Sequence, residues 1–238
     1  MNNQLAVIIP TFNEAENIES LLNHLILNAS KKELLSICVI DGGSTDNTIG
    51  IINSFIKKHP NENIKCIASN KGRAKQMNNG VNNTEGNILY FLHADSFPPK
   101  NFDASIRDEI SKGNTAGCFT MKFNSKHWWL KLAGWLTQFN SIACRGGDQS
   151  LFITRDLFKE LGGYDEKYTI YEDQDLISKL YTRKNFTIIK QWLTTSARRY
   201  ESNGIWKLQY HFWTIYVKKF FGATADELHD YYLKYIKD

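Results

Sequence analysis

The chain has 238 residues, of which 42% are hydrophobic and 23% are charged, and its formal net charge is +4. This composition is ordinary for a globular protein, and so small a charge argues against a nucleic-acid partner. No apolar run approaches the roughly 20 residues that a membrane-spanning helix needs, and no charged leader precedes an apolar stretch at the start. The four cysteines have no paired spacing, which suits a reducing compartment. We therefore expect a soluble, cytoplasmic protein, and peripheral contact with the inner face of a membrane stays open.

The first hundred residues alternate between two kinds of apolar pattern. Continuous apolar runs predict buried strands at 5–9, 37–40 and 88–92, and a mostly apolar run predicts another strand at 64–68. Apolar residues at helical spacing predict helices around 18–26, 51–56 and 74–81. Strands and helices that alternate with short links predict an α/β fold, in which a mostly parallel, Rossmann-like central sheet has helices on both faces.

The alternation loosens in the second half of the chain. The patterns there predict helices at 102–112, 128–139 and 173–183 and strands at 117–123 and 150–154. A last predicted helix, 205–221, carries aromatic residues around much of its circumference, so it needs cover from the domain, a partner or a lipid surface. Residues 183–238 hold ten Lys and Arg against five Asp and Glu, so this basic tail could face an anionic membrane or substrate.

Polar residues follow each of the four predicted strands of the first half. The candidate site residues in these loops are Pro10, Thr11, Asn13 and Glu14 after the first strand, Asp41 and Gly43 after the second, Lys71 and Arg73 after the third, and His93 and Asp95 after the fourth. The carboxyl ends of parallel strands lie along one edge of a sheet, so these residues should surround one pocket. Any one loop alone is more simply a turn or a helix cap, but four on one edge favour a ligand site.

The chemistry of this edge suits a nucleotide bound with a divalent metal ion. The loop Thr11–Glu14 and Asp41 offer hydrogen-bonding groups for a base or a ribose, and the two cations after the third strand offer donors for phosphates. His93 and Asp95 are two residues apart on an extended chain and therefore point to the same side. Asp95 is a hard oxygen ligand of the kind that Mg²⁺ and Mn²⁺ prefer.

Seven motifs carry a resemblance to a known family. They are Val7–Glu14, Val39–Thr48, Gly72-Arg73, His93-Ala94-Asp95, Gly147-Asp148-Gln149, Leu161–Tyr164 and Glu172-Asp173. Their order and spacing are similar to those of the family 2 glycosyltransferases of the GT-A fold, over roughly residues 5–185. The chain looks most like small bacterial members without membrane spans, some of them associated with arsenosugar biosynthesis. The resemblance implies a GT-A domain over 1–200, with a nucleotide-binding half (1–100) and an acceptor half (101–200), and a C-terminal helical extension over 201–238.

The resemblance also implies roles for individual residues. Asp41 would contact the base, Asp95 would ligate Mn²⁺ or Mg²⁺ on the diphosphate of a UDP- or GDP-sugar, and Asp173 would be the general base. The family usually has a carboxylate where this chain has His93. Imidazole can bind Mn²⁺ but suits Mg²⁺ poorly. We therefore expect Asp95 to be the sole strong metal ligand of the pair, with His93 either at the metal or hydrogen-bonded to the nucleotide.

The acidic cluster around Asp173 precedes the apolar stripe of a predicted helix. A carboxylate there could simply cap the positive end of the helix dipole, which is a sufficient explanation in most proteins. A helix N-terminus also keeps a carboxylate ionised, and transfer to a hydroxyl needs an ionised carboxylate near that hydroxyl. We favour Asp173 as a catalytic base, and Glu172 is the competing assignment.

Two more groups of residues could contact substrates. One is the glycine-containing loop with Arg145, Gly147, Asp148 and Gln149, which a ligand could approach closely and which we assign to the sugar or the acceptor. The other is the pair Arg198 and Arg199, which could form a second clamp on the diphosphate. The alternatives are an ordinary turn for the loop and solvated surface for the pair.

These features together predict a metal-dependent, inverting glycosyltransferase with a small or lipid-linked acceptor. A nucleotidyltransferase that makes sugar nucleotides is a second hypothesis, although its usual Gly-rich basic loop is absent from Pro10–Glu14. A non-catalytic nucleotide-sugar binding protein, with His93 as a mark of lost activity, is a third. Membrane contact through the 205–221 helix and a homodimer are both compatible with these features.

Overall fold

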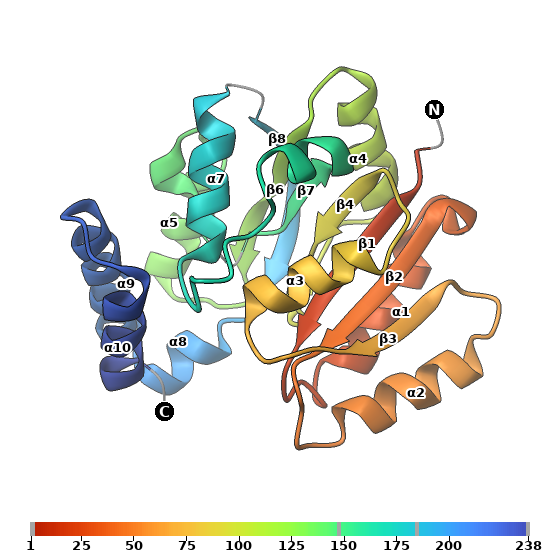
Figure 1. Cartoon of the computed structure of the whole chain (residues 1–238), viewed down its shortest axis with the longest axis horizontal. Helices are drawn as coiled ribbons and strands as arrows, with labels where there is room; N and C mark the ends of the chain where they lie inside the picture. Colours follow the sequence, from red (N-terminus) through yellow and green to blue (C-terminus); the bar gives the residue numbers. More distant parts are fainter. Residues whose placement is uncertain (1–2, 147–148, 184–185, 237–238) are drawn as a thin grey trace.

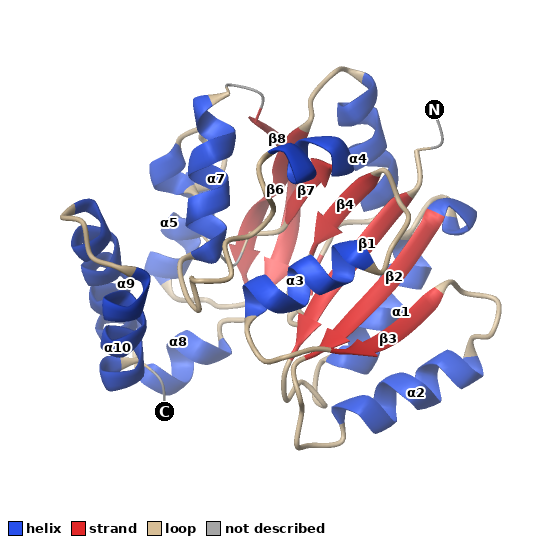
Figure 2. Cartoon of the chain, viewed as in Figure 1, coloured by secondary structure: helices blue, strands red, loops and turns tan. Residues whose placement is uncertain are grey.

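An eight-stranded sheet crosses the molecule in the computed structural model, which describes residues 3–146, 149–183 and 186–236. The strand order is β3-β2-β1-β4-β7-β6-β8-β5, and helices cover both faces (Figure 1 and Figure 2). The strands are β1 (Leu5–Thr11), β2 (Leu35–Asp41), β3 (Ile64–Ala68), β4 (Ile88–Phe91), β5 (Ser96–Phe97), β6 (Ala116–Phe123), β7 (Leu151–Thr154) and β8 (Phe186–Thr195). The helices are α1 (Ile18–Asn28), α2 (Thr48–Lys58), α3 (Arg73–Asn82), α4 (Phe102–Ser111), α5 (Trp128–Leu136), α6 (Arg155–Glu160), α7 (Glu172–Thr182), α8 (Arg198–Asn203), α9 (Ile205–Phe220) and α10 (Ala225–Tyr235), with 3₁₀ turns at Lys32–Leu34 and Ile142–Cys144.

The first half of the chain forms the parallel part of the sheet. β1 lies between β2 and β4 and pairs in parallel with both, and β2 pairs in parallel with β3. Beyond β4 the directions are mixed, because β7 runs antiparallel to both β4 and β6, whereas β6 and β8 are parallel. The mostly parallel sheet between helices that the sequence patterns predict is confirmed.

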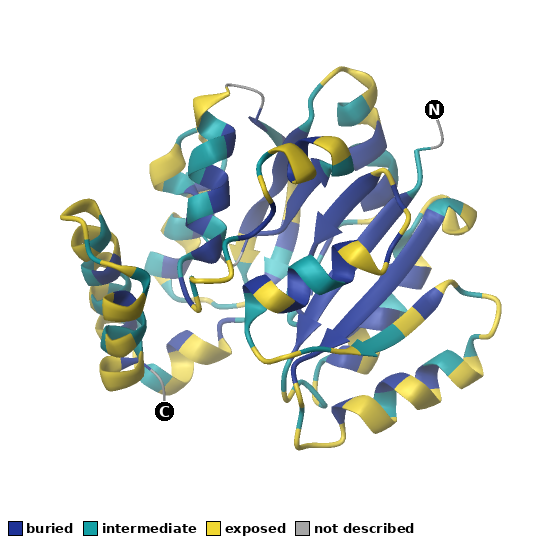
Figure 3. Ribbon diagram, viewed as in Figure 1, coloured by how far each residue is buried: buried dark blue, intermediate teal, exposed yellow. Residues whose placement is uncertain are grey.

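Alternate residues of β1 pack into two different hydrophobic cores. Leu5, Val7 and Ile9 face one core, which α1, α2 and α4 complete, whereas Ala6 and Ile8 face a second core, which α3, α6 and α7 complete. Successive side chains of a strand point to opposite faces, so a strand between two helix layers must be continuously apolar. Figure 3 shows the resulting burial of the central strands. This burial on both faces fixes the strand ends that carry the predicted site.

Several elements were not predicted from the sequence, among them β8 and α10. The pairing of β8 with β6 shifts register between Phe119 and Thr120, whose partners are Ile189 and Trp192. The extra residues of this bulge break the in-and-out alternation by which a strand is recognised. α10 does have a local signal, because Thr224 and Glu227 form a capping box at its start.

The C-terminal helices share a third hydrophobic core with α5. Leu130 of α5, Leu208 of α9 and Leu228 of α10 are buried together in it. Trp129 donates a hydrogen bond from its indole nitrogen to Oε1 of Gln209 (3.1 Å), which ties α9 to α5. The domain therefore covers one side of the predicted aromatic helix. None of the helices in the described residues combines the length and apolarity that crossing a membrane requires.

Candidate functional site

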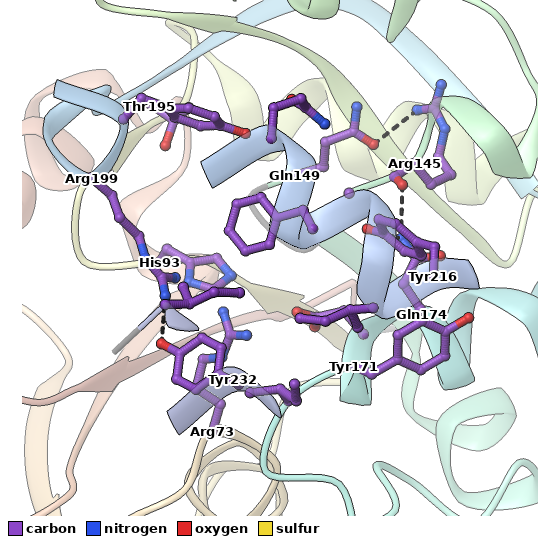
Figure 4. Close-up of a pocket in the computed structure, with 18 of the residues that line it drawn as sticks. Arg73, His93, Arg145, Gln149, Tyr171, Gln174, Thr195, Arg199, Tyr216 and Tyr232 are labelled. Atoms are coloured by element: carbon purple, nitrogen blue, oxygen red, sulfur yellow. Dashed lines mark hydrogen bonds between the residues drawn. The ribbon is translucent and has the colours of Figure 1, made fainter. Parts of the chain in front are cut away.

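The loops after β1, β3 and β4 border one large cavity of about 1980 Å³. α7 and the C-terminal helices supply its other walls, so its lining comes from segments far apart in the sequence (Figure 4). The predicted site residues that line it are Pro10, Thr11, Glu14, Lys71, Arg73, His93, Asp95, Arg145, Gln149, Asp173, Arg198 and Arg199. The predicted residues Asn13, Asp41, Gly43 and Glu172 are not in this lining, and Gly147 and Asp148 lie outside the described residues.

The loops after β1 and β2 are tied to each other by side-chain hydrogen bonds. The buried Asp41 accepts bonds at Oδ2 from the amides of Gly43 and Ser44, both at 2.9 Å, and at Oδ1 from the Ser44 hydroxyl at 2.5 Å. Ser44 Oγ accepts a hydrogen bond from the backbone amide of Asn13 (2.9 Å), and the side-chain oxygen Oδ1 of Asn13 accepts one from the backbone amide of Thr45 (2.8 Å). Asp41 and Asn13 therefore shape the two loops, and contact between Asp41 and a base stays a prediction.

Gln76 of α3 holds the ends of β1 and β2 at the edge of the site. Its side chain is buried, and its Nε2 donates to the backbone carbonyls of Thr11 (2.9 Å) and Ile40 (2.7 Å). Gly42 packs against the same amide, because a β-carbon at that position would come within 3.0 Å of it. Gln76 lies 65 and 36 residues from its two partners, so no local sequence pattern indicates this positioning role.

The two cations after β3 have different partners. Lys71 Nζ lies 3.4 Å from the ring centroid of Phe12, on the cavity wall. Arg73 Nε lies 2.6 Å from Oε1 of Glu172, whose side chain is fully buried at the first position of α7. Arg73 therefore connects the nucleotide half of the fold to the helix that carries Asp173. Contact of either cation with phosphates stays a prediction.

Asp173 occupies the second position of α7, so its predicted place at a helix start is confirmed. Tyr171 precedes the helix with φ of 75°, a left-handed value that few side chains adopt. The adjacent carboxylates have different surroundings, because Glu172 is buried whereas Asp173 is half-buried and lines the cavity. Tyr164 is buried beside both, and burial, followed by the charges of Asp173 and Glu172, raises the pKa of Tyr164 well above its ordinary value.

Replacing Glu172 with Gln should lower the free energy of unfolding by about 1–3 kcal/mol, because Arg73 loses its buried charged partner while the volume of the side chain is kept. Urea denaturation measures this change. Glu160 is a matched control: its Oε1 lies 2.7 Å from Nη1 of Arg183, but its side chain is 60% exposed. Glu160→Gln should therefore cost less than about 1 kcal/mol. Equal losses would mean that burial adds nothing to the Arg73–Glu172 pair.

His93 and Asp95 both line the cavity where β4 ends. The turn is fixed because the Ser96 amide donates to the His93 carbonyl (3.1 Å) and the Ser196 amide donates to the Asp95 carbonyl (3.2 Å). Among the described residues, no group of three or more His, Cys, Asp or Glu side chains could hold a metal. This donor set fits a Mg²⁺ or Mn²⁺ ion that takes most of its ligands from phosphate oxygens and water.

Arg145 and Gln149 border the cavity but bind mainly to the protein itself. The buried Arg145 guanidinium donates to the carbonyls of Thr137 (2.6 Å) and Phe139 (2.5 Å) and to Oε1 of Gln149 (3.1 Å). Gln174 of α7 donates in turn to the Arg145 carbonyl at 2.7 Å (Figure 4). These bonds fix the loop before β7 against α7. The predicted contact of this loop with the sugar or the acceptor is not tested by them.

The two arginines at the start of α8 connect different parts of the cavity wall. Arg198 Nη2 lies 3.2 Å from Oε1 of Glu14, and its Nη1 lies 3.5 Å from Oε2 of Glu16, so it ties α8 to the loop after β1. Arg199 donates a hydrogen bond to the Tyr232 hydroxyl of α10 (Figure 4). A second clamp on a diphosphate stays a prediction for this pair.

A cavity at the carboxyl ends of parallel strands is where open α/β sheets bind their ligands, and nucleotides are common among these. Residues 6–159 match the sequence model of the family described as "Glycosyl transferase family 2". The chain therefore belongs to glycosyl transferase family 2, which is the family that its motifs resemble.

The fold is shared with solved glycosyltransferases. The crystal structure of S. aureus TarS with UDP has a TM-score of 0.68 at 20% sequence identity, covering 81% of this chain and 60% of that one. The mannosyltransferase PcManGT from Pyrobaculum calidifontis, with GDP-Man and Mn²⁺, has a TM-score of 0.65 at 20% identity, covering 99% and 64%. These likenesses confirm the predicted GT-A-type fold.

Curated relatives are similar over part of their length. The dolichyl N-acetyl-alpha-D-glucosaminyl phosphate 3-beta-D-2,3-diacetamido-2,3-dideoxy-beta-D-glucuronosyltransferase of Methanococcus voltae is 35% identical over 101 residues, which is 42% of this chain and 32% of that protein. The dolichyl-phosphate beta-glucosyltransferase of Dictyostelium discoideum is 34% identical over 102 residues, which is 40% and 31%. The chain thus spans about a third of the length of these two relatives.

Proposed function

We propose that the protein is an inverting glycosyltransferase that moves a sugar from a nucleoside-diphosphate sugar to an acceptor hydroxyl. The observation that carries the proposal is that the polar strand-end loops and Asp173 of α7 border the same cavity. Membership of glycosyl transferase family 2 supports sugar transfer as the reaction. Residues 1–100 then bind the nucleotide, 101–200 bind the acceptor, and 201–238 form a helical extension.

The donor is a UDP- or GDP-sugar, bound with Mn²⁺ or Mg²⁺. Structural neighbours that contain UDP, or GDP-Man with Mn²⁺, support this choice. Lys71 and Arg73 contact the diphosphate, and Asp95 would hold the ion, with His93 either at the ion or hydrogen-bonded to the nucleotide. When bound, the ion offsets negative charge on the departing nucleoside diphosphate.

Asp173 accepts the proton of the acceptor hydroxyl as that oxygen attacks the anomeric carbon from the face opposite the diphosphate. The bond from the anomeric carbon to the phosphate oxygen breaks as the new glycosidic bond forms, so no covalent enzyme intermediate is needed. Glu172 is the weaker candidate for the base because its side chain is fully buried and paired with Arg73.

The acceptor is a small molecule or a lipid-linked one. Relatives whose names include dolichyl phosphate favour the lipid-linked class. A cytoplasmic location with the 205–221 helix in peripheral contact with the inner face of a membrane agrees with this class, and a homodimer is compatible with it. The predicted helix corresponds to α9.

Incubation with Mn²⁺ and a panel of nucleotide sugars should release nucleoside diphosphate slowly, because water replaces the missing acceptor. The nucleotide of the donor is identified first, from the shifts in melting temperature that UDP and GDP produce with and without Mn²⁺. Release of pyrophosphate from a nucleoside triphosphate would instead indicate a nucleotidyltransferase. Binding without any release would indicate a non-catalytic nucleotide-sugar binding protein, and either result would overturn the proposed reaction.

A further inference from the structure

Tryptophans are concentrated on two neighbouring helices that border the cavity. Of the six tryptophans in the chain, five lie on α5 and α9 and only Trp192 lies elsewhere, on β8. The two helices meet where the Trp129 ring packs against Trp206 and Trp213, with ring centroids 5.3 and 5.8 Å apart. Trp128, Trp206 and Trp213 are nevertheless about half exposed. Exposed apolar side chains that gather in one patch often mark a binding site for a partner, a ligand or a membrane.

α9 carries an apolar stripe that the protein buries only in part. Trp206, Trp213, Val217 and Phe220 follow one another at intervals of seven, four and three residues, so they lie on one face of the helix. Their exposed fractions range from 50% to 85%. The opposite face, with Leu208, is buried in the third core. Packing within the chain therefore explains one face of α9 and leaves the other unexplained.

The part of the stripe from Trp213 to Phe220 forms one wall of an apolar groove inside the cavity. The groove residues are Trp129, Ala133 and Leu136 of α5 and Trp213, Val217 and Phe220 of α9. The same cavity reaches Asp95 and Asp173, so the groove is continuous with the proposed reaction site. Four of the six groove side chains have no group that can hydrogen-bond. The other two, Trp129 and Trp213, have one indole donor each, and the indole of Trp129 already donates to Gln209. A sugar bound along these walls would leave many of its hydroxyls unpaired.

Both helices that form the groove are basic. Neither α5 nor α9 contains Asp or Glu, and together they carry Lys131, Lys207, Lys218 and Lys219. A helix with tryptophans and other apolar residues on one face and lysines on its flanks is typical of binding to an anionic membrane surface. Indole rings in particular prefer the boundary between headgroups and acyl chains.

We propose that the groove between α5 and α9 holds the hydrocarbon chain of a lipid-linked acceptor, which the protein takes from an anionic membrane surface. This inference rests on the proposed function, because it assigns an acceptor class to the same site. The hydrocarbon chain of the acceptor lies along Trp213, Val217 and Phe220 of the stripe, and the polar end of the acceptor reaches Asp173. The lysines of α5 and α9 hold the groove mouth at the anionic surface.

Binding of farnesyl phosphate to the full-length protein, followed by tryptophan fluorescence, tests whether the groove takes a hydrocarbon chain. Inorganic phosphate is the reference ligand, because it has the headgroup without the chain. Farnesyl phosphate should bind at least about tenfold more tightly than phosphate, since each buried methylene contributes roughly 0.8 kcal/mol. Val217→Glu places a charge in the groove wall and should weaken farnesyl phosphate binding at least about tenfold. Phosphatidylglycerol vesicles with brominated acyl chains should quench the fluorescence of the unmodified protein and not that of Val217→Glu.

Leu27→Glu is the matched control, because Leu27 of α1 is 74% exposed, lies outside the cavity lining and receives the same charge. It should bind farnesyl phosphate and vesicles like the unmodified protein, and melting temperatures check that both variants fold. Equal effects of the two substitutions, or no preference for farnesyl phosphate over phosphate, would overturn the inference. The inference would also be overturned if the unmodified protein formed a dimer that Val217→Glu dissociates, because a second copy of the protein would then cover the groove. If the unmodified protein still releases nucleoside diphosphate from a nucleotide sugar, the proposed function survives that failure.

Discussion

Replacing Asp173 with Asn should lower the rate of sugar transfer by about 10²–10⁴-fold, the usual contribution of a general base, while nucleotide affinity stays nearly unchanged. Asn has almost the same shape, so it can keep its place at the second position of α7, but it cannot accept the acceptor proton. Initial rates of transfer and calorimetric titration with the nucleoside diphosphate measure the two effects separately. The separation matters because a capping carboxylate would affect folding and binding together.

Asp175 provides the matched control for this substitution. It lies in the same first turn of α7, but its Oδ2 is 2.7 Å from Nζ of Lys179 and it does not border the cavity. Asp175→Asn removes the same charge from the same helix end, so any effect through the helix dipole, worth roughly 0.3–1 kcal/mol, should appear in both variants. If the two variants lose transfer to the same extent, or if Asp173→Asn loses donor binding as much as turnover, Asp173 is not the base.

Sequence patterns predict those parts of this fold in which the burial of each residue determines its type. β1 and β2 are buried on both faces, so their central residues, 5–9 and 37–40, are continuously apolar and each run is visible in the sequence. The polar residues just after β1, β3 and β4 could be placed on one edge because strand direction follows from the alternation with helices. β8 lacks such a signal, since its bulge opposite Phe119 and Thr120 interrupts the pattern.

The interactions within the site were not predictable for a different reason. The sequence predicts phosphate contact for Arg73 and offers Glu172 as the competing catalytic base, yet the structure joins the two in an ion pair although they lie 99 positions apart in the chain. Gln76 and Arg145 likewise bind backbone carbonyls whose positions depend on the whole fold. Sequence can indicate that a polar residue is near a site, but whether its polar atoms face a ligand or the protein is decided by tertiary packing.

Replacing Asp95 with Ala should lower metal-stimulated turnover by about 10²-fold, since one fixed electrostatic contact to the leaving group typically contributes this much. Asp95 lines the cavity on the turn after β4, whose backbone is held by Ser96 and Ser196, so the substitution should leave the fold intact. The assay compares initial rates across a Mn²⁺ titration, and the unmodified protein in excess chelator provides the reference for full loss. Activity of the unmodified protein that persists in chelator would contradict a role for the metal.

The small number of candidate metal ligands around Asp95 also predicts how the metal ion and the nucleotide affect each other's binding. No group of three or more His, Cys, Asp or Glu side chains in the described residues could hold a metal, so an ion at Asp95 would take most of its other ligands from phosphate oxygens and water. Ion and nucleotide must then bind with positive coupling, and each should strengthen the affinity of the other by the same factor. Mn²⁺ alone and UDP or GDP alone should therefore raise the melting temperature less, in sum, than the two together. In Asp95→Ala this excess should vanish, whereas stabilisation by the nucleotide alone should persist, because the donors that bind the base and ribose are unchanged.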